Sequence, residues 1–279
     1  MAGKKNGGLP RRRGTAADRR LRARGAKGAL PDKLPLVHVT AVGIAREIVA
    51  ARQLQTSPCP VFGKVPLLYF FVLRPAYRRK DGDAKSHQIN RFPFVFILSP
   101  DAVPTPYHVY PFDTGGAESG VFAPQADPHD YLEDYELAPS HEAAVGHIGW
   151  AFATLDAYFE GELRRDILDG VPQHETVTRG FVDIARLART GSNQPDKRAS
   201  AVEIATDQNV PLKGNVLLAI LPKQYLEDAS VSNKQFMDRL KAEEVAWKTY
   251  DWQPNTAPNE FQEEIARIAK KWLSDNKLL

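Results

Sequence analysis

The sequence predicts an α+β fold, in which helices are segregated from a largely antiparallel β-sheet. Runs of β-branched and aromatic residues with strand length gather before residue 112 and recur after residue 200. The helical patterns come in groups and do not alternate with strands as a parallel βαβ sheet requires. The composition, with 43% hydrophobic and 25% charged residues, is that of an ordinary globular protein.

The first elements are expected between residues 34 and 112. Residues 34–40, LPLVHVT, read as a short strand. A helix should follow over 41–54, because Ile44, Ile48 and Val49 recur there at helical spacing. Three apolar or aromatic runs predict further strands at 65–74, 92–98 and 107–112.

The middle of the chain is expected to hold loops and then helices. Residues 113–120, DTGGAESG, read as a glycine-rich loop, and the acidic stretch 124–136 reads as an exposed loop. Two helices are expected over 141–168 and 175–190, followed by a polar break.

The last third predicts two strands and then only helices. One strand surrounds Glu203 and the other covers 215–221. The segments 233–250 and 259–273 are amphipathic, so both are expected to be helices, with no further strand.

The charge is unevenly distributed along the chain. Residues 1–30 carry ten Lys and Arg against one acid, a balance of +9, so the other 249 residues sum to −6 within the total of +3. This head is too poor in apolar residues to offset its ordering entropy, and we expect residues 1–30 to be a disordered basic tail. It could attract nucleic acid or be a solvated tail without a partner. We expect residues 31–279 to form a single domain, with a helical insertion at about 138–190 and helices at its C-terminal end.

Several classes of protein are disfavoured by the sequence. The lone Cys59 excludes an internal disulfide framework, and no Cys and His cluster has zinc-ligand spacing, so we expect no metal. No apolar stretch approaches the roughly 20 residues that cross a bilayer, which points to a soluble protein of a reducing, cytoplasmic compartment. The chain also lacks a G-x-G-x-x-G turn, a phosphate-binding P-loop and a G-x-S-x-G elbow, which disfavours dehydrogenases, P-loop NTPases and serine hydrolases.

Strand alternation draws attention to Glu203. Val202 and Ile204 should face one side of their strand, leaving Glu203 on the other side between Ala201 and Ala205, in a space that the two alanines keep open. A carboxylate there is a candidate catalytic group. The alternative is an edge-strand charge that discourages aggregation.

Alternation singles out three further polar residues. In the strand 34–40, His38 and Thr40 share the side opposite Val37 and Val39, and Arg74 ends the apolar run before Pro75. Each has an ordinary explanation, a satisfied histidine for His38 and a strand-end charge paired with a surface acid for Arg74. Taken singly, none of them carries a functional claim.

The order of four short segments resembles that of DarT-type ADP-ribosyltransferases. His38-Val-Thr40 stands first, YFFVLRP with Arg74 follows, then DTGGA with Asp113 and Thr114, and last DKRASAVEIATDQNVPL with Arg198 and Glu203. The likeness covers roughly residues 35–222 and is dense only in these segments. The chain departs from the family pattern where Phe replaces the usual Tyr in the second segment, where Thr and Asp are exchanged in the third, and where Val202 precedes the glutamate.

The resemblance implies a fold and a set of roles. The fold is an ADP-ribosyltransferase-like split β-sheet core with surrounding helices, and the activity is an NAD-dependent glycosyl transfer that needs no metal. Glu203 and Arg74 would be catalytic. NAD would be bound as the cofactor by four residues on two strands: His38, Thr40, Tyr69 and Phe71.

The resemblance also implies partners for the chain. The implied acceptor is a nucleobase of nucleic acid, with single-stranded DNA favoured, which Arg78, Arg79 and Lys80 would bind beside the cleft. The enzyme would be a toxin-like or defence effector with an antitoxin or regulatory protein as a further partner. Two alternatives stay open, an NAD glycohydrolase or protein ADP-ribosyltransferase, and a non-enzymatic nucleic-acid-binding module.

Overall fold

The computed structural model describes residues 7–11, 21, 30–76, 84–190, 196–228 and 230–279. The chain divides into two compact units. The first unit comprises Met1–Lys33, Pro58–Val65 and Thr105–Ala205, and the second comprises Leu34–Ser57, Pro66–Pro104 and Thr206–Leu279. Each unit is built from segments far apart in the sequence. The expectation of one domain over 31–279 stays a prediction.

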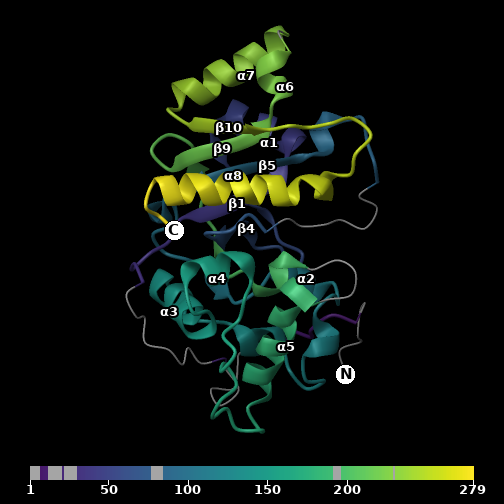
Figure 1. Ribbon diagram of the computed structural model, residues 1–279, viewed down its shortest axis with the longest axis vertical. Helices are drawn as coiled ribbons and strands as arrows, with labels where there is room; N and C mark the ends of the chain where they lie inside the picture. The colour runs from purple at the N-terminus through teal and green to yellow at the C-terminus, as the bar shows by residue number, and fades with distance from the viewer. Residues whose placement is uncertain (1–6, 12–20, 22–29, 77–83, 191–195, 229) are drawn as a thin grey trace. The chain divides into compact units, whose positions relative to one another are not determined.

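The second unit is built on a mixed sheet with strand order β10-β9-β5-β1-β4 (Figure 1). β1 pairs antiparallel with both β4 and β5, β5 pairs antiparallel with β9, and β9 pairs parallel with β10. The strands are β1 (Leu36–Ala41), β4 (Pro66–Val72), β5 (Pro93–Leu98), β9 (Val216–Pro222) and β10 (Ala246–Tyr250). The predicted α+β class, with a sheet core and surrounding helices, is confirmed.

Helices cover both faces of this sheet. On one face Phe94 packs edge-on against Phe236 of α7, and on the other Tyr250 packs against Phe261 at the start of α8. Figure 1 shows α8 crossing one face, with α1 behind the strands. The helices of this unit are α1 (Val42–Ala51), α6 (Gln224–Glu227), α7 (Val231–Ala242) and α8 (Gln262–Asp275). Two short strands, β2 (Gln53–Leu54) and β8 (Val210–Pro211), pair separately.

The strand β10 corrects the expectation of a helix over 233–250 and of no further strand. α7 ends at Ala242, and Glu244 adopts a left-handed conformation with φ 60°. The Val245 N–H then donates to the Leu240 carbonyl and closes the turn. Residues 246–250 alternate in exposure as a strand does, and the pairing with β9 outweighs their helical spacing.

The first unit holds most of the middle of the chain. Its strand pair is β6 (His108–Tyr110) with β7 (Glu203–Thr206), which is antiparallel and continues just past the end of the unit. Its helices are α2 (Thr114–Glu118), α3 (His141–Ala151), α4 (Leu155–Glu160) and α5 (Thr176–Thr190). The long helix expected over 141–168 is interrupted, because Phe152 is extended, the Thr154 hydroxyl caps α4 and Gly161 ends it.

The acidic stretch 124–136 is buried in its second half, at Asp130 and at residues 132–135, which corrects the expectation that all of it is an exposed loop. Asp130 and Asp134 are both fully buried. Asp130 accepts a hydrogen bond from the Tyr135 hydroxyl (2.7 Å), and Asp134 accepts one from the Tyr131 N–H (2.9 Å). Local donors satisfy these carboxyl groups, so the stretch can enter the core.

The basic head has two buried residues among those described, and the expectation that residues 1–30 are disordered stays a prediction. Leu9 and Leu21 are buried, and their N–H groups donate to the carbonyls of Ala117 and Asp134. Two leucines within a polar segment are enough to anchor it at these points. Residues 1–6, 12–20 and 22–29 lie outside the described residues. In the described parts of the chain, no helix is both long and apolar enough to cross a membrane.

Candidate active site

The strand pair β6–β7 places three polar side chains together in the first unit. Tyr110 lies opposite Glu203, and His108 lies opposite Ala205. Residues opposite each other in an antiparallel pair share a face, so His108 and Tyr110 stand on the same side as Glu203. Glu203 is only 2% exposed. The sequence predicted an open space beside Glu203, because its neighbours on that face are two small alanines. In the structure the rings of His108 and Tyr110, from the paired strand, lie on this side.

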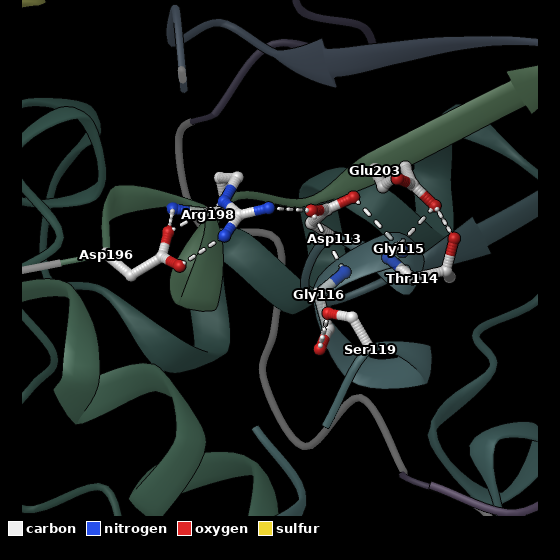
Figure 2. Close-up of polar contacts among 8 residues, drawn as sticks. All are labelled: Asp113, Thr114, Gly115, Gly116, Ser119, Asp196, Arg198 and Glu203. Atoms are coloured by element: carbon white, nitrogen blue, oxygen red, sulfur yellow. Dashed lines mark hydrogen bonds and ion pairs between the residues drawn. The ribbon is translucent and has the colours of Figure 1, made fainter. Parts of the chain in front are cut away.

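The short helix α2 holds the Glu203 carboxylate. Thr114 donates to Glu203 Oε1 from its hydroxyl (2.7 Å) and from its backbone N–H (3.4 Å), as Figure 2 shows. The segment is a helix where a loop was expected, because Asp113 caps it by accepting from the N–H groups of Gly115 and Gly116. A Cβ at Gly116 would lie 2.6 Å from the Phe122 ring, so only glycine lets α2 pack this closely.

An arginine locks the same helix from the opposite side. Arg198 Nη1 donates to Asp113 (2.7 Å), and its Nε and Nη2 donate to the two oxygens of Asp196 (2.9 and 2.6 Å), as seen in Figure 2. Burial alone would lower the pKa of Arg198, but its hydrogen bonds to Asp196 and the charge of Asp113 raise that pKa. The Asp196–Arg198–Asp113 chain of ion pairs therefore fixes the helix that positions Glu203.

Burial changes the acidity of the groups in this site. It raises the pKa of Glu203 well above its usual range, and the negative charge of Asp113 raises it further, while the hydrogen bonds from Thr114 lower it in part. Burial, reinforced by the positive charge of Arg11, lowers the pKa of His108 to about 3. The imidazole is therefore neutral at physiological pH. Its Nε2 lies 3.8 Å from Glu203 Oε1.

Two aromatic residues complete the surroundings of Glu203. The Tyr110 hydroxyl is fully buried and has no hydrogen-bond partner within the described part of the chain. The Phe62 ring stacks on His108 with centroids 4.4 Å apart, and the Arg11 guanidinium lies 4.3 Å from the Phe62 centroid. An unpartnered hydroxyl beside a carboxyl group can donate to a bound ligand.

The sequence analysis missed His108, Tyr110 and Phe62 as site residues. The signal for the first two is present in YHVYPF, where His108 and Tyr110 are two residues apart and so share one face of a strand. Phe62 carries no such signal, because it comes from a turn whose place in the first unit depends on the fold.

The four proposed NAD-binding residues lie in the second unit and divide between two faces of its sheet. Val37 pairs with Phe71 across β1 and β4, so Tyr69 and Phe71 share the face of Val37. His38 and Thr40 point to the other face, where His38 packs edge-on against Phe70 at 5.8 Å. The structure does not bring the two pairs together on one face.

His38 is half-buried and held by the backbone of the next strand. Its Nδ1 donates to the Tyr69 carbonyl (2.9 Å), which leaves Nε2 as the acceptor of the neutral ring. Burial lowers the pKa of His38, and this hydrogen bond opposes the shift. The ring is thus held neutral and oriented.

Arg74 lies two residues after the end of β4 and is 2% exposed. The preceding Leu73 has φ 62°, a left-handed conformation that is unfavourable for a residue with a side chain. Such strain is found at sites where surrounding contacts fix the backbone. Arg74 belongs to the second unit and Glu203 to the first, so their convergence, and that of His38 with Glu203, stays a prediction. Arg78, Arg79 and Lys80 lie outside the described residues.

Comparison with known proteins gives only distant similarity. No protein-family model and no curated protein matches the chain. Three solved structures of DarT from Thermus sp. 2.9 are similar to it, one with carba-NAD+ (11% identity, 79% of this chain and 96% of that chain, TM-score 0.36). The others are DarT with NAD+ (10%, 80% and 98%, TM-score 0.36) and with ADP-ribosylated ssDNA (10%, 83% and 97%, TM-score 0.34). The chain is thus distantly similar to DarT, at TM-scores too low to carry conclusions about its chemistry. No group of three or more His, Cys, Asp or Glu side chains in the described residues could hold a metal ion.

Proposed function

We propose that this chain is an ADP-ribosyltransferase that transfers ADP-ribose from NAD to a nucleobase of nucleic acid, with single-stranded DNA as the favoured acceptor. The observation that carries the proposal is the setting of Glu203, a buried carboxyl group that a capped helix holds in place within the last of the four segments resembling the DarT type. A carboxyl group fixed in this way suits the chemistry of glycosidic bond cleavage.

In the proposed reaction the bond between the anomeric carbon of the ribose and the nicotinamide nitrogen breaks. Its electron pair stays with the nitrogen, so nicotinamide leaves as a neutral molecule and positive charge develops on the ribose. The Glu203 carboxylate stabilises this charge. A nitrogen or oxygen of the acceptor then forms the new bond to the anomeric carbon, and the proton it loses passes to Glu203 or to water.

The raised pKa of Glu203 in the free protein fits a site that binds a cationic substrate. The nicotinamide ring of NAD carries a positive charge, and such a charge beside a carboxyl group favours its ionised form. NAD binding would therefore lower the pKa of Glu203 and favour the carboxylate that the reaction needs. The Thr114 hydroxyl keeps Oε1 in place through this change, since it donates to the charged form.

The other roles follow from the chemistry of each side chain. Tyr110, with its hydroxyl unpartnered among the described residues, would donate to a ribose hydroxyl next to Glu203. From the second unit, Arg74 would bind the pyrophosphate, and His38 with Thr40 would hydrogen-bond the ribose or the nicotinamide amide. Phe70 packs against His38 and would be an aromatic contact on that face, and NAD binding by Tyr69 and Phe71 stays a prediction. Arg78, Arg79 and Lys80 would bind the acceptor strand.

The proposal is tested by incubating the full chain with NAD labelled in the adenylate moiety and with separate pools of single-stranded DNA, RNA and protein. We expect the label in the DNA pool, and its loss in Glu203→Gln. Glu142→Gln is the matched control, because Glu142 is an exposed carboxylate of the same unit. Label in the protein pool would indicate that the acceptor is a protein. Free ADP-ribose formed without any oligonucleotide would indicate that the acceptor is water. Equal labelling by Glu203→Gln and the wild-type chain would refute the proposed role of Glu203.

An ADP-ribose group attached to a nucleobase would obstruct base pairing, so unrestrained activity on DNA would harm the cell that contains the enzyme. We therefore extend the proposal to a toxin-like or defence effector, held in check by an antitoxin or another regulatory protein. Expression of the wild-type chain and of Glu203→Gln in separate cultures tests this extension, because only the wild-type chain should arrest growth.

A further inference from the structure

A pocket of about 410 Å³ in the first unit is lined by four arginines. They come from two segments that the site around Glu203 does not use: the turn after α4 and the last turns of α5. The arginines are Arg164, Arg165, Arg186 and Arg189.

The backbone explains why these side chains meet. Gly161 ends α4 with φ 78°, a conformation that turns the chain sharply at this point. On α5, Arg186 and Arg189 are three residues apart and so stand on one face of the helix. An ion pair between Arg189 and Glu162 joins the two walls.

The pocket also has an apolar part. Ile167 is buried and Leu163 is half-buried, and both line the pocket beside the guanidinium groups. Apolar lining with a few charged groups is the usual composition of a small-molecule or cofactor site, and the volume falls within the range of such sites.

The charges in and around the pocket do not cancel. Arg164 pairs with Asp166, Arg186 with Asp183 and Arg189 with Glu162, whereas Arg165 forms no hydrogen bond or ion pair with the described residues. The lining residues include four guanidinium groups and one carboxylate, that of Glu162, so positive charge is in excess there. The three ion pairs are all exposed, and exposed pairs contribute little, so an incoming anion can take over their guanidinium groups at small cost.

We propose that this pocket binds one phosphodiester-linked nucleotide of a single-stranded nucleic acid. Guanidinium groups match phosphate oxygens in geometry, and the negative charge of a phosphodiester is opposite in sign to the excess in the pocket. The base would lie against Leu163 and Ile167. Only a single strand offers an unstacked base for such a contact. The site goes beyond the proposed transfer reaction, because it is separate from Glu203 and its binding needs no NAD.

Binding is measured without NAD by the fluorescence anisotropy of a short labelled oligothymidylate at several salt concentrations. We expect the double variant Arg165→Ala/Arg189→Ala of the full chain to weaken binding by about tenfold, as the loss of two exposed charged contacts implies. The slope of log affinity against log salt should fall by about 0.7, since the pocket holds one phosphate and each phosphate contact on a single strand contributes about 0.7. The basic head has the same sequence in every variant.

Two further variants separate a binding role from damage to the fold. Arg239→Ala removes an exposed arginine from α7 in the second unit and should leave both quantities unchanged. Glu162→Gln removes the acid that competes for Arg189 and should tighten binding by about threefold. A damaged fold cannot produce tighter binding.

The source of the nucleotide is tested by competition. We expect unlabelled oligothymidylate to displace the probe, and thymidine monophosphate to displace it only at much higher concentration. Equal displacement by the mononucleotide and the oligonucleotide would overturn the assignment to a nucleic acid strand. An unchanged affinity and salt slope in Arg165→Ala/Arg189→Ala would overturn the site itself, and neither result would bear on the reaction proposed for Glu203.

Discussion

The hydrogen bond from Thr114 to Glu203 allows a quantitative test of the proposed catalytic group. In Thr114→Val the side chain keeps its shape but loses the hydroxyl that donates to Oε1 at 2.7 Å, while the backbone N–H still donates at 3.4 Å. This hydroxyl favours the charged form of Glu203, so its loss should raise the pKa of Glu203 further.

The size of the effect follows from the strength of the bond. A hydrogen bond to a charged group contributes about 1.5–3 kcal/mol. One pKa unit corresponds to about 1.36 kcal/mol, so the pKa of Glu203 in Thr114→Val should lie about one to two units above that of the wild-type chain. If the ionised carboxylate is the active form, activity falls as pH decreases through this pKa. The acid limb of the pH profile should therefore move to higher pH by about one to two units.

The assay is the release of nicotinamide from NAD across a pH series, with kcat/KM measured at each pH. Asp113→Asn should shift the pKa of Glu203 in the opposite direction. It removes a negative charge that raises the pKa of Glu203, so its acid limb should move to lower pH. An acid limb that stays in place in Thr114→Val, or moves to lower pH, would refute the reasoning, because the carboxyl group that Thr114 holds would then not be the one that limits the reaction.

Three further predictions concern buried groups of the first unit. His147 packs against Phe181 at 4.6 Å with neither ring nitrogen bonded to the described residues, and burial lowers its pKa to about 3. His147 therefore binds a proton more readily in the unfolded chain, and the folded state loses stability as pH falls from about 6.5 toward 3. The variant His147→Phe has no such loss. Its free energy of unfolding in urea, relative to that of the wild-type chain, should therefore increase by about 2 kcal/mol between pH 7.5 and pH 5. Arg198→Met leaves Asp113 and Asp196 without their cation and should lower the free energy of unfolding by about 3–5 kcal/mol. The control variant Arg239→Met should change it by less than about 0.5 kcal/mol. Equal effects of the two variants would contradict the role of the buried ion pairs. Tyr110→Phe removes a buried hydroxyl without a described partner, so the melting temperature should hold or rise while the KM for NAD increases; an unchanged KM would show that this hydroxyl does not contact NAD.

Runs of apolar and β-branched residues predicted several strands correctly. The strand around Glu203 exists, and the apolar runs at 65–74 and 92–98 form β4 and β5. These segments were readable because apolar and β-branched residues of strand length have few other stable arrangements. The same local rule could not rank strand pairing against helical spacing, which is why β10 was missed.

The errors near the candidate site have a common cause, since they depend on contacts distant in sequence. DTGGAESG looked like a loop, but Asp113 is both a helix cap and the partner of Arg198, 85 residues away. The acidic stretch looked solvated, but Thr176 from α5 donates to Asp130 and helps to bury it. Single-strand alternation likewise placed His38 and Thr40 on one side without showing, as the register does, that Tyr69 and Phe71 face away from them.

The central claim is that the Glu203 carboxylate promotes cleavage of the glycosidic bond of NAD. The most direct measurement is the single-turnover rate of nicotinamide release by the full chain and by Glu203→Gln, with equal secondary structure and melting behaviour established first. Glutamine keeps the size of the side chain and removes its charge. We predict that the rate falls by at least about a hundredfold, as loss of a principal electrostatic contact to the transition state implies. A variant that releases nicotinamide at the wild-type rate would contradict the account.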